Sequence, residues 1–180
     1  MKSLKGSQTE KNILTAFAGE SQARNRYDYF AGRAKNDGFV LVQEIFVETA
    51  LQEKEHAKRL FKFLEGGDVE ITAAFPAGII TGTEANLYAA AAGEHHEYTE
   101  MYPDFLKAAE VEGNKEAIKT FTFAMKAEAV HARLYQEALE NLDQTEEVFY
   151  YLCPLCGNIE KAVPDKCAIR GVPGTSFIKY

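Results

Sequence analysis

Two short stretches, QEKEHAKRL at residues 52–60 and AEAVHARLY at residues 127–135, carry the same motif, Glu-x-x-His followed by Ala. The motif residues are Glu53, His56, Glu128 and His131. On a helix, residues three apart share a face, so both side chains of each motif point the same way. A single copy is most often a solvated surface pair. Two copies in a repeated frame instead favour a shared site.

A further glutamate precedes each motif by about one helix. The sequence reads NILTAFAGE up to Glu20 and NLYAAAAGE up to Glu94. The second half also carries Glu97, one turn beyond Glu94. The chain therefore contains an internal repeat, and each half supplies an upstream Glu and a downstream Glu-x-x-His.

Helical spacing of apolar residues predicts four helices. Their expected ranges are 9–36, 40–65, 83–112 and 115–141. The first should end at Asp37-Gly38, and the third should begin with Thr83 as its N-cap. Pro103 lies inside the third helix and should kink it. Two short links and one long link, residues 67–82, predict an all-α bundle with the single crossover of the ferritin-like fold.

The five glutamates lie on the apolar stripes of the predicted helices, and the two histidines also point inward. An isolated buried carboxylate costs several kcal/mol or becomes protonated. No Lys or Arg on these stripes lies level with the glutamates as a counter-ion. Two divalent cations would neutralise the carboxylates, and this set of ligands is typical of di-iron and di-manganese bundles. The predicted bundle ligands are Glu20, Glu53, His56, Glu94, Glu97, Glu128 and His131.

Tyr27 and Tyr102 lie one or two turns from these ligands. Both could be ordinary aromatic core residues. Alternatively, their hydroxyl groups could hold a ligand carboxylate in place.

The helical pattern stops near residues 143–147, which divides the chain into a bundle, 1–145, and a C-terminal part, 146–180. All three cysteines lie in the second part, at Cys153, Cys156 and Cys167. Cys-x-x-Cys-Gly is a metal-binding knuckle, and a second knuckle is expected at Cys167. Arg170 occupies the place of its second cysteine, and a guanidinium cannot bind a metal. Another ligand or water could complete the site, the site could be weakened, or the tail could be metal-free.

The net charge of −7 argues against a nucleic-acid partner, because no basic face is available to neutralise phosphates. No apolar run approaches the about 18 residues of a membrane span, and the N-terminus has no apolar signal core. We therefore expect a cytoplasmic protein.

With these residues in place, the chain resembles the rubrerythrins over its whole length. The resemblance rests on Glu20, Glu53-x-x-His56, Glu94-x-x-Glu97, Glu128-x-x-His131 and the final SFIKY. It implies a non-haem di-iron peroxidase that reduces hydrogen peroxide to water. It also implies a rubredoxin-like domain with one iron bound by four cysteines, although zinc could take this place. Electrons would arrive through that centre from rubredoxin or an NAD(P)H-dependent reductase, and the protein would form a homodimer.

The resemblance further implies that one iron exchanges His56 for Glu97 with redox state. We expect Glu53 and Glu128 to bridge the two ions, with Glu20 and Glu94 as terminal ligands. His131 would bind one ion, and His56 or Glu97 the other. Glu97, His56, Tyr27 and Tyr102 are the candidate catalytic residues. The alternatives are an iron-oxidising or iron-storing relative of ferritin and a metal-stabilised structural module.

Overall fold

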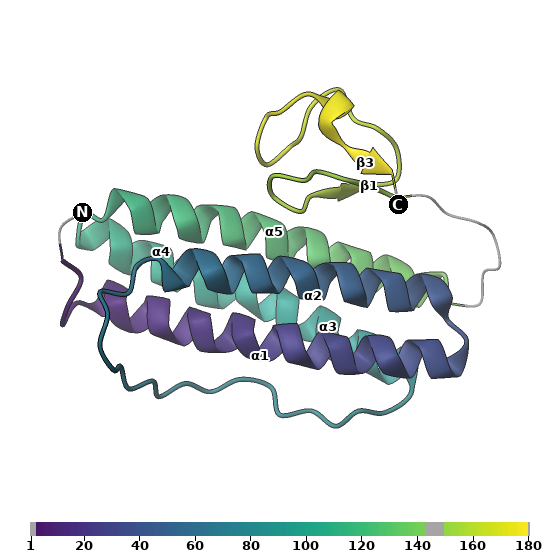
Figure 1. Ribbon diagram of the computed structural model, residues 1–180, viewed down its shortest axis with the longest axis horizontal. Coiled ribbons are helices and arrows are strands. Elements are labelled where there is room, and N and C mark those ends of the chain that lie inside the picture. The colour runs from purple at the N-terminus through teal and green to yellow at the C-terminus, as the bar shows by residue number, and fades with distance from the viewer. Residues whose placement is uncertain (1–2, 143–149, 180) are drawn as a thin grey trace.

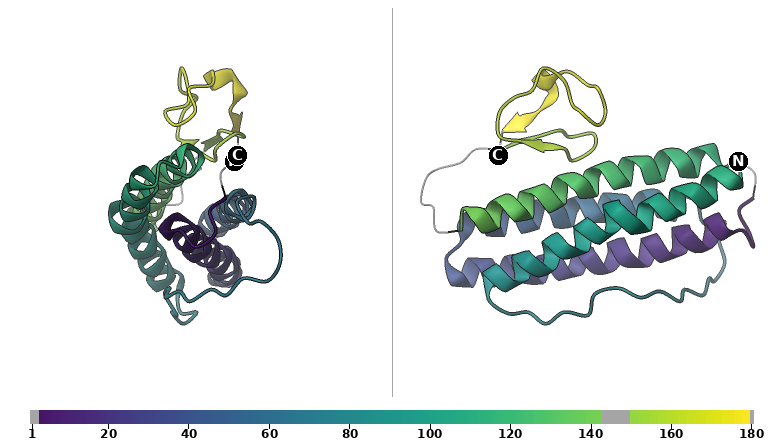
Figure 2. Two further views of the ribbon diagram at one scale, coloured as in Figure 1. Left: turned by 90° about the vertical axis from the view of Figure 1, so that its left-hand side faces the viewer. Right: turned by 180° about the vertical axis from the view of Figure 1, so that it is seen from behind.

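The computed structural model describes residues 3–142 and 150–179, and its main body is a bundle of long helices (Figure 1). The elements in chain order are α1 (Gln8–Asp37), α2 (Val40–Phe61), α3 (Thr83–His96), the π-helix η1 (Glu97–Met101), α4 (Tyr102–Val111) and α5 (Lys115–Glu140). The connection between α2 and α3 runs along the outside of the bundle from one end to the other (Figures 1 and 2). The predicted all-α, ferritin-like bundle with one crossover is confirmed.

Short polar side chains and glycines set the helix ends. Ser7 accepts a hydrogen bond from the Glu10 N–H and so caps α1, and Asn114 caps α5 in the same way. Gly38, with φ of 87°, ends α1 in the left-handed conformation that glycine adopts without strain. The tight links that follow keep α1 beside α2, and α4 beside α5.

Three expected features of the helices are wrong in detail. Helix α2 ends at Phe61, not near Glu65. Beyond its end, the Glu65 carboxylate accepts hydrogen bonds from the Leu4 N–H and the Ser3 hydroxyl near the N-terminus. The N-cap of α3 is Gly82. Thr83 instead donates its hydroxyl to Asp37 at the end of α1, at 2.7 Å.

The third difference concerns Pro103, which follows a π-helix and does not lie inside one continuous α-helix. The π-helix η1 precedes it, and the Tyr102 N–H bonds the Glu97 carbonyl five residues back. Pro103 then lies in the first turn of α4, where its missing N–H removes no helical hydrogen bond. The long predicted helix is therefore three consecutive segments.

The bundle core consists of two apolar clusters along its axis. One is built around Phe30, Phe46 and Tyr135, and the other around Leu60 and Phe121. The buried glutamates described below lie between them in sequence on each long helix. Within the described residues, no helix is both long and apolar enough to cross a membrane.

The C-terminal part is a small three-stranded antiparallel sheet in the order β2-β1-β3, with the turn η2 (Gly174–Ser176) before its last strand. Its strands are β1 (Tyr151–Leu152), β2 (Ile159–Glu160) and β3 (Ile178–Lys179). The sheet rests on α5, where Arg133 donates to the Ile159 carbonyl at 2.9 Å (Figure 1). The predicted boundary at 143–147 lies outside the described residues.

Candidate metal centre

Four helices each direct one glutamate into the middle of the bundle. The four are Glu20 on α1, Glu53 on α2, Glu94 on α3 and Glu128 on α5, each at most 2% exposed. Carboxylates are rarely buried to this extent without a partner. Their convergence from both halves of the chain makes this the first candidate site.

The ligand atoms form two overlapping groups, in each of which they lie within 4.8 Å of one another. The first group is Glu20, Glu53, His56 and Glu128, and the second is Glu53, Glu94, Glu128 and His131. Glu53 and Glu128 belong to both groups. The arrangement thus offers two neighbouring positions for cations, with two carboxylates shared between them.

Several of the converging atoms make no hydrogen bond among the described residues and face only the other atoms of the cluster. They are Glu20 Oε2, Glu53 Oε1, Glu94 Oε2, both carboxylate oxygens of Glu128, and His131 Nδ1. Their near neighbours are the two imidazoles, with His131 Nδ1 2.9 Å from Glu53 Oε1 and His56 Nδ1 3.2 Å from Glu128 Oε1. Hard carboxylate oxygens with imidazole nitrogens suit iron or manganese, so the residues fit a pair of such ions.

The electrostatics agree with this fit. Burial, followed by the negative charge of Glu53, raises the pKa of Glu94 to about 7. Burial and the charges of Glu53 and Glu128 likewise raise the pKa of Glu20 well above its usual value. The cluster therefore holds its full negative charge at neutral pH only when cations compensate it.

Both predicted tyrosines contact a ligand carboxylate, and they do so in a reciprocal way. Tyr27 on α1 donates its hydroxyl to Glu94 on α3, and Tyr102 at the start of α4 donates to Glu20 on α1. Burial raises the pKa of both phenols well above the usual value, so both remain donors. Each hydroxyl satisfies one oxygen of a carboxylate and leaves the other directed at the cluster.

Sequence reasoning missed Gln52, which orients His131. Its Oε1 lies 2.8 Å from His131 Nε2, and the donor there is Nε2–H when Nδ1 is free for a metal. His131 Nδ1 then faces Glu53 and Glu128, at 2.9 Å from each. Gln52 is one residue before the motif, and only the partner helix α5 reveals its role.

Arg26 was also missed. It is 5% exposed, and its guanidinium lies 5.2 Å from the centre of the Tyr27 ring, with Nη2 3.5 Å from the Tyr27 hydroxyl. A cation therefore lies behind Tyr27, although none was expected near the stripes. Its position beside Tyr27 in the chain, off the ligand stripe, gave no signal.

Glu97 is the predicted bundle ligand that lies outside both groups. It is the first residue of η1 and is half-buried. Burial and then the charge of Glu20 raise its pKa well above the usual value, so it lies within electrostatic reach of the cluster. π-Helical turns inside α-helices often occur at functional sites.

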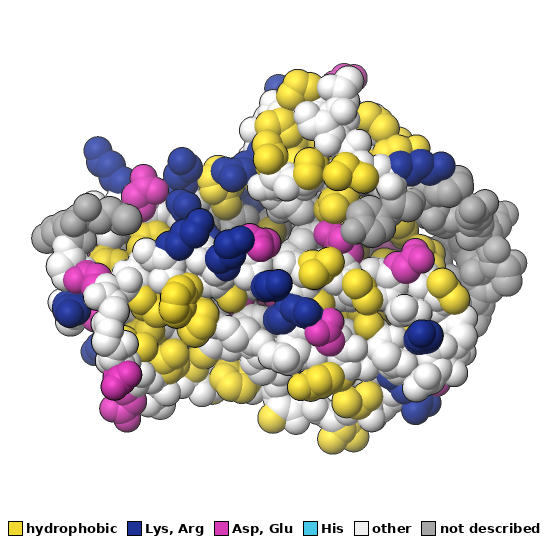
Figure 3. Space-filling model, viewed as in Figure 1, with side chains coloured by type: hydrophobic (Ala, Val, Ile, Leu, Met, Phe, Trp, Pro, Cys, Tyr) yellow, Lys and Arg dark blue, Asp and Glu magenta, His cyan; other side chains and the backbone are white. Residues whose placement is uncertain are grey.

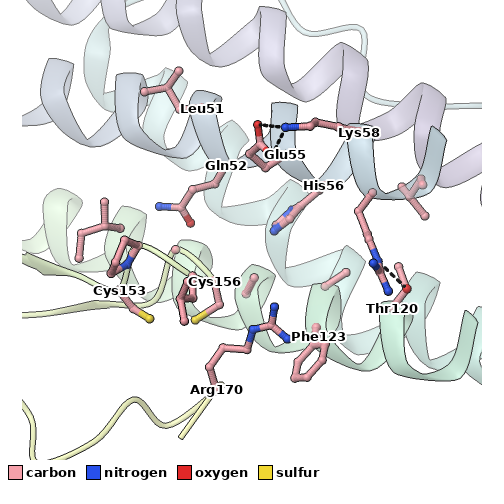
Figure 4. A pocket seen from close by; sticks show the side chains of 18 of the residues that line it. Leu51, Gln52, Glu55, His56, Lys58, Thr120, Phe123, Cys153, Cys156 and Arg170 are labelled. Atoms are coloured by element: carbon pink, nitrogen blue, oxygen red, sulfur yellow. Dashed lines mark hydrogen bonds and ion pairs between the residues drawn. The ribbon is translucent and has the colours of Figure 1, made fainter. Parts of the chain in front are cut away.

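The two groups differ in access. The His56 side chain is 17% exposed, whereas that of His131 is 0% exposed. His56 and Gln52 line a cavity of about 520 Å³ between the C-terminal part and the bundle (Figure 4). A small molecule in this cavity would reach the first group and not the second.

The three predicted cysteine ligands also lie together. Their sulfur atoms are within 4.8 Å of one another, and Cys156 Sγ lies 3.4 Å from Cys167 Sγ. All three are free thiols. Cys153, Cys156 and Arg170 line the same cavity as His56, from the opposite side (Figure 4).

Comparison with known proteins identifies the family. The sequence matches the family profile described as rubrerythrin over residues 11–139. The chain belongs to the rubrerythrin family. A rubrerythrin of Nitratidesulfovibrio vulgaris is 55% identical, covering 98% of this chain and 96% of the relative. A rubrerythrin of Porphyromonas gingivalis is 50% identical, covering 98% and 92%.

Solved structures resemble this rubrerythrin along nearly its whole length. Nigerythrin in a mixed-valence state has a TM-score of 0.84 at 33% identity and covers 99% of this chain and 89% of its own. Nigerythrin in a fully reduced, all-ferrous state has a TM-score of 0.81 at 32% identity and covers 98% and 91%. The latter protein holds ferrous iron. In the rubrerythrin described here, the two carboxylate–histidine groups are the candidate iron site.

Proposed function

We propose that this rubrerythrin binds two iron ions in its bundle and reduces hydrogen peroxide to water. The observation that carries the proposal is the pair of ligand groups that share Glu53 and Glu128. Glu20 and Glu94 would hold one ion each, His131 one of them, and His56 or Glu97 the other. The two electrons that cleavage of one O–O bond requires would come from the ferrous pair when bound.

The chain's own residues define how peroxide reaches the centre. Peroxide enters from the cavity past the partly exposed His56, while Gln52 and the protein interior seal His131. Tyr102 fixes Glu20 on this accessible side. Glu97 lies near enough to Glu20 to influence its charge, and we assign it as the carboxylate that replaces His56.

The electron donor in this proposal is rubredoxin or an NAD(P)H-dependent reductase. The resemblance also implies a relay through a four-cysteine iron, but this chain offers three cysteines, so the relay is not part of the proposal. A homodimer, a cytoplasmic location and the division into residues 1–145 and 146–180 belong to the same proposal.

The test is peroxide consumption by the iron-loaded, chemically reduced full-length protein. We expect rapid oxidation of the iron with one peroxide consumed per two ferrous ions. Glu97→Ala should lose turnover and retain bound iron. The matched control is Glu100→Ala, which changes an exposed glutamate of the same π-helix that pairs with His96.

Two results would contradict the proposal. One is reduced protein that ignores peroxide but oxidises added ferrous iron with oxygen, which is the behaviour of a ferritin-like iron-handling protein. The other is full peroxidase turnover by Glu97→Ala, which would exclude the assigned exchange of ligands.

A further inference from the structure

The backbone of the C-terminal part forms two metal-binding knuckles, which together have four ligand positions. Only three of these positions hold a cysteine. In the first knuckle, the Cys153 N–H bonds the Asn158 carbonyl at 2.8 Å and the Gly157 N–H bonds the Cys153 carbonyl at 2.9 Å. In the second, the Cys167 N–H bonds the Val172 carbonyl and the Gly171 N–H bonds the Cys167 carbonyl, both at 2.8 Å. The two turns therefore share these two hydrogen bonds.

The glycines of the two turns match as well. Gly157 has φ of 77° and Gly171 has φ of 69°, the left-handed conformation that closes each knuckle. Position 170 therefore corresponds to Cys156 in the first knuckle. The fold presents four ligand positions, and the fourth holds Arg170.

The Arg170 side chain turns away from the sulfur atoms. Its guanidinium lies 4.5 Å from the centre of the Phe123 ring on α5, a cation–π distance (Figure 4). Its backbone N–H remains in the knuckle and donates to Cys167 Sγ at 3.3 Å. Among the residues the structure describes, no His, Asp or Glu joins the three cysteines as a fourth ligand.

These residues do not fit a four-thiolate iron centre, but they do fit a tetrahedral ion with one open position. At a zinc–sulfur distance of about 2.3 Å, two tetrahedral ligands lie roughly 3.8 Å apart. The 3.4 Å between Cys156 and Cys167 is close to this value. Zinc readily accepts three protein ligands and one external ligand.

The charges around the cavity bear on the external ligand. A divalent ion with three thiolates carries a net charge of −1. More basic than acidic side chains line the cavity. The basic ones are Lys58, Arg59, Lys62, Lys119 and Arg170, and the acidic ones are Glu48 and Glu55. Lys and Arg side chains also gather beside the C-terminal part on this face (Figure 3). A small anion is thus favoured as the external ligand.

We propose that Cys153, Cys156 and Cys167 of this chain bind one zinc ion whose fourth position is open to a small anionic ligand from the cavity, in place of a rubredoxin-type iron. Sulfur ligands suit zinc, and the cysteine thiols lose their protons when the ion binds. The site is then redox-inactive and exchanges its external ligand.

Full-length protein loaded with cobalt as a spectroscopic substitute for zinc tests the site. Because the bundle site contains no sulfur, thiolate-to-cobalt charge-transfer absorption reports the cysteines alone. We expect this absorption, and we expect it to shift when a small thiol such as 2-mercaptoethanol is added. In Arg170→Cys, a fourth protein thiolate should fill the position and abolish the shift.

Metal analysis gives an independent measurement. The unaltered protein should contain one zinc ion more per chain than a variant with all three cysteines changed to serine. After loading with iron, ferric–thiolate absorption of the four-sulfur type should be present in Arg170→Cys and absent from the unaltered protein. Arg170→Ala is the matched control and should also lack the four-sulfur absorption, because it removes the guanidinium but adds no sulfur.

Three outcomes would overturn the inference. The first is four-sulfur ferric absorption in the unaltered protein. The second is equal zinc content in the unaltered protein and the triple-serine variant. The third is a cobalt spectrum that added thiol leaves unchanged.

Discussion

At the scale of single residues, each half of the repeat supports the carboxylate of the other half. The Tyr27 hydroxyl donates a hydrogen bond to Glu94, and the Tyr102 hydroxyl donates one to Glu20. The two hydroxyl groups act across the bundle, since each joins one helix of the first half to one segment of the second. The outer carboxylates of the site are therefore held by contacts that exist only after the halves have packed together.

Replacing Tyr102 by Phe should weaken the site without disturbing the core. The ring remains, but one buried oxygen of Glu20 loses its donor, at a cost of about 1–3 kcal/mol. We expect lower thermal stability and a metal affinity reduced by about 10–100-fold, as for other supporting contacts of metal ligands. Calorimetry and metal titration measure both. Tyr135→Phe is the control, because its hydroxyl contacts Thr49 and no carboxylate; an equal loss of affinity there would contradict the assignment.

Gln52→Met should affect the His131 group selectively. The variant keeps the side-chain volume but removes the acceptor at 2.8 Å that orients the imidazole. Metal affinity should fall by about 10–100-fold, mainly for one of the two ions. Stepwise titration with metal would resolve the two binding events. Gln136→Met, on the exposed face of α5, should leave both unchanged, and so the idea fails if the two variants behave alike.

Much of the site was predictable from the sequence, because a charged residue on an apolar helical stripe is conspicuous. Glu53 and His131 are visible in this way. Gln52 and Arg26 are not, since a buried polar side chain beside a stripe is recognisable only when its partner helix is in place. Glu97 shows a second limit, because helical periodicity alone does not reveal that it begins a π-helix and lies outside the two groups of closely spaced ligand atoms.

At the scale of elements, η1 reconciles two demands on one helix. Glu94 in α3 and Tyr102 in α4 both contribute to the site, yet Pro103 cannot lie in a helix interior without losing a hydrogen bond and clashing. The π-helical turn η1 accommodates both, because Pro103 then lies in the first turn of α4. A helix of uniform period is the simplest expectation from sequence, so the π-helix before Pro103 was not predicted.

Deleting Thr99, an exposed residue of η1, should force this segment into a regular α-helix. The Pro103 ring would then meet the carbonyl four residues earlier, which costs about 3 kcal/mol. Urea unfolding should show a loss of this size, and adding Pro103→Ala to the deletion should recover most of it. Pro103→Ala alone is the control and should have little effect. A deletion variant as stable as the parent would mean that η1 relieves no strain.

Acid should loosen the start of α1 through Glu112. This carboxylate accepts from the Gln8 N–H at 2.8 Å and the Thr9 N–H at 2.9 Å. Hydrogen bonds from Thr9, then from Gln8, lower the pKa of Glu112 from its ordinary 4.5. Because the folded pKa is the lower one, this stabilisation is present above pH 4.5 and is lost as pH falls through the folded pKa.

The measurement is the pH dependence of the thermal midpoint. Glu112→Gln should lower the midpoint at neutral pH and flatten its fall in the acid range below pH 4.5. Glu110→Gln is the control. It changes an exposed glutamate two residues before Glu112 and should retain the parent profile. Parallel profiles for the parent and Glu112→Gln would exclude this role.

At the scale of the whole molecule, the glutamates interrupt the core between two apolar clusters. The carboxylates there face His56 and His131 within the cluster, and bound cations would cross-link the four helices. Four helices meet there, and both halves of the chain supply ligands. The metal centre should thus be a determinant of global stability as well as the site of reaction.

Removing metal should lower the thermal midpoint of the entire bundle. Saturation of one site at a hundred times its Kd stabilises a protein by about 2.7 kcal/mol, and a chelator abolishes this contribution. Calorimetry with and without chelator measures the difference. Glu53→Ala, which lacks a carboxylate common to both groups, should respond weakly to the chelator. An unchanged midpoint in the parent would show that the buried carboxylates do not depend on cations.

The connection between Phe61 and Thr83 runs along the outside of the bundle and is largely exposed. A protease that cuts there would divide the chain into two hairpins, and each fragment would keep three of the four residues of one ligand group and one of the four residues of the other. The fragments would then associate more strongly in the presence of iron, because each ion needs residues from both. The crossover thus divides the polypeptide into two complementary pieces whose reassembly would report the metal.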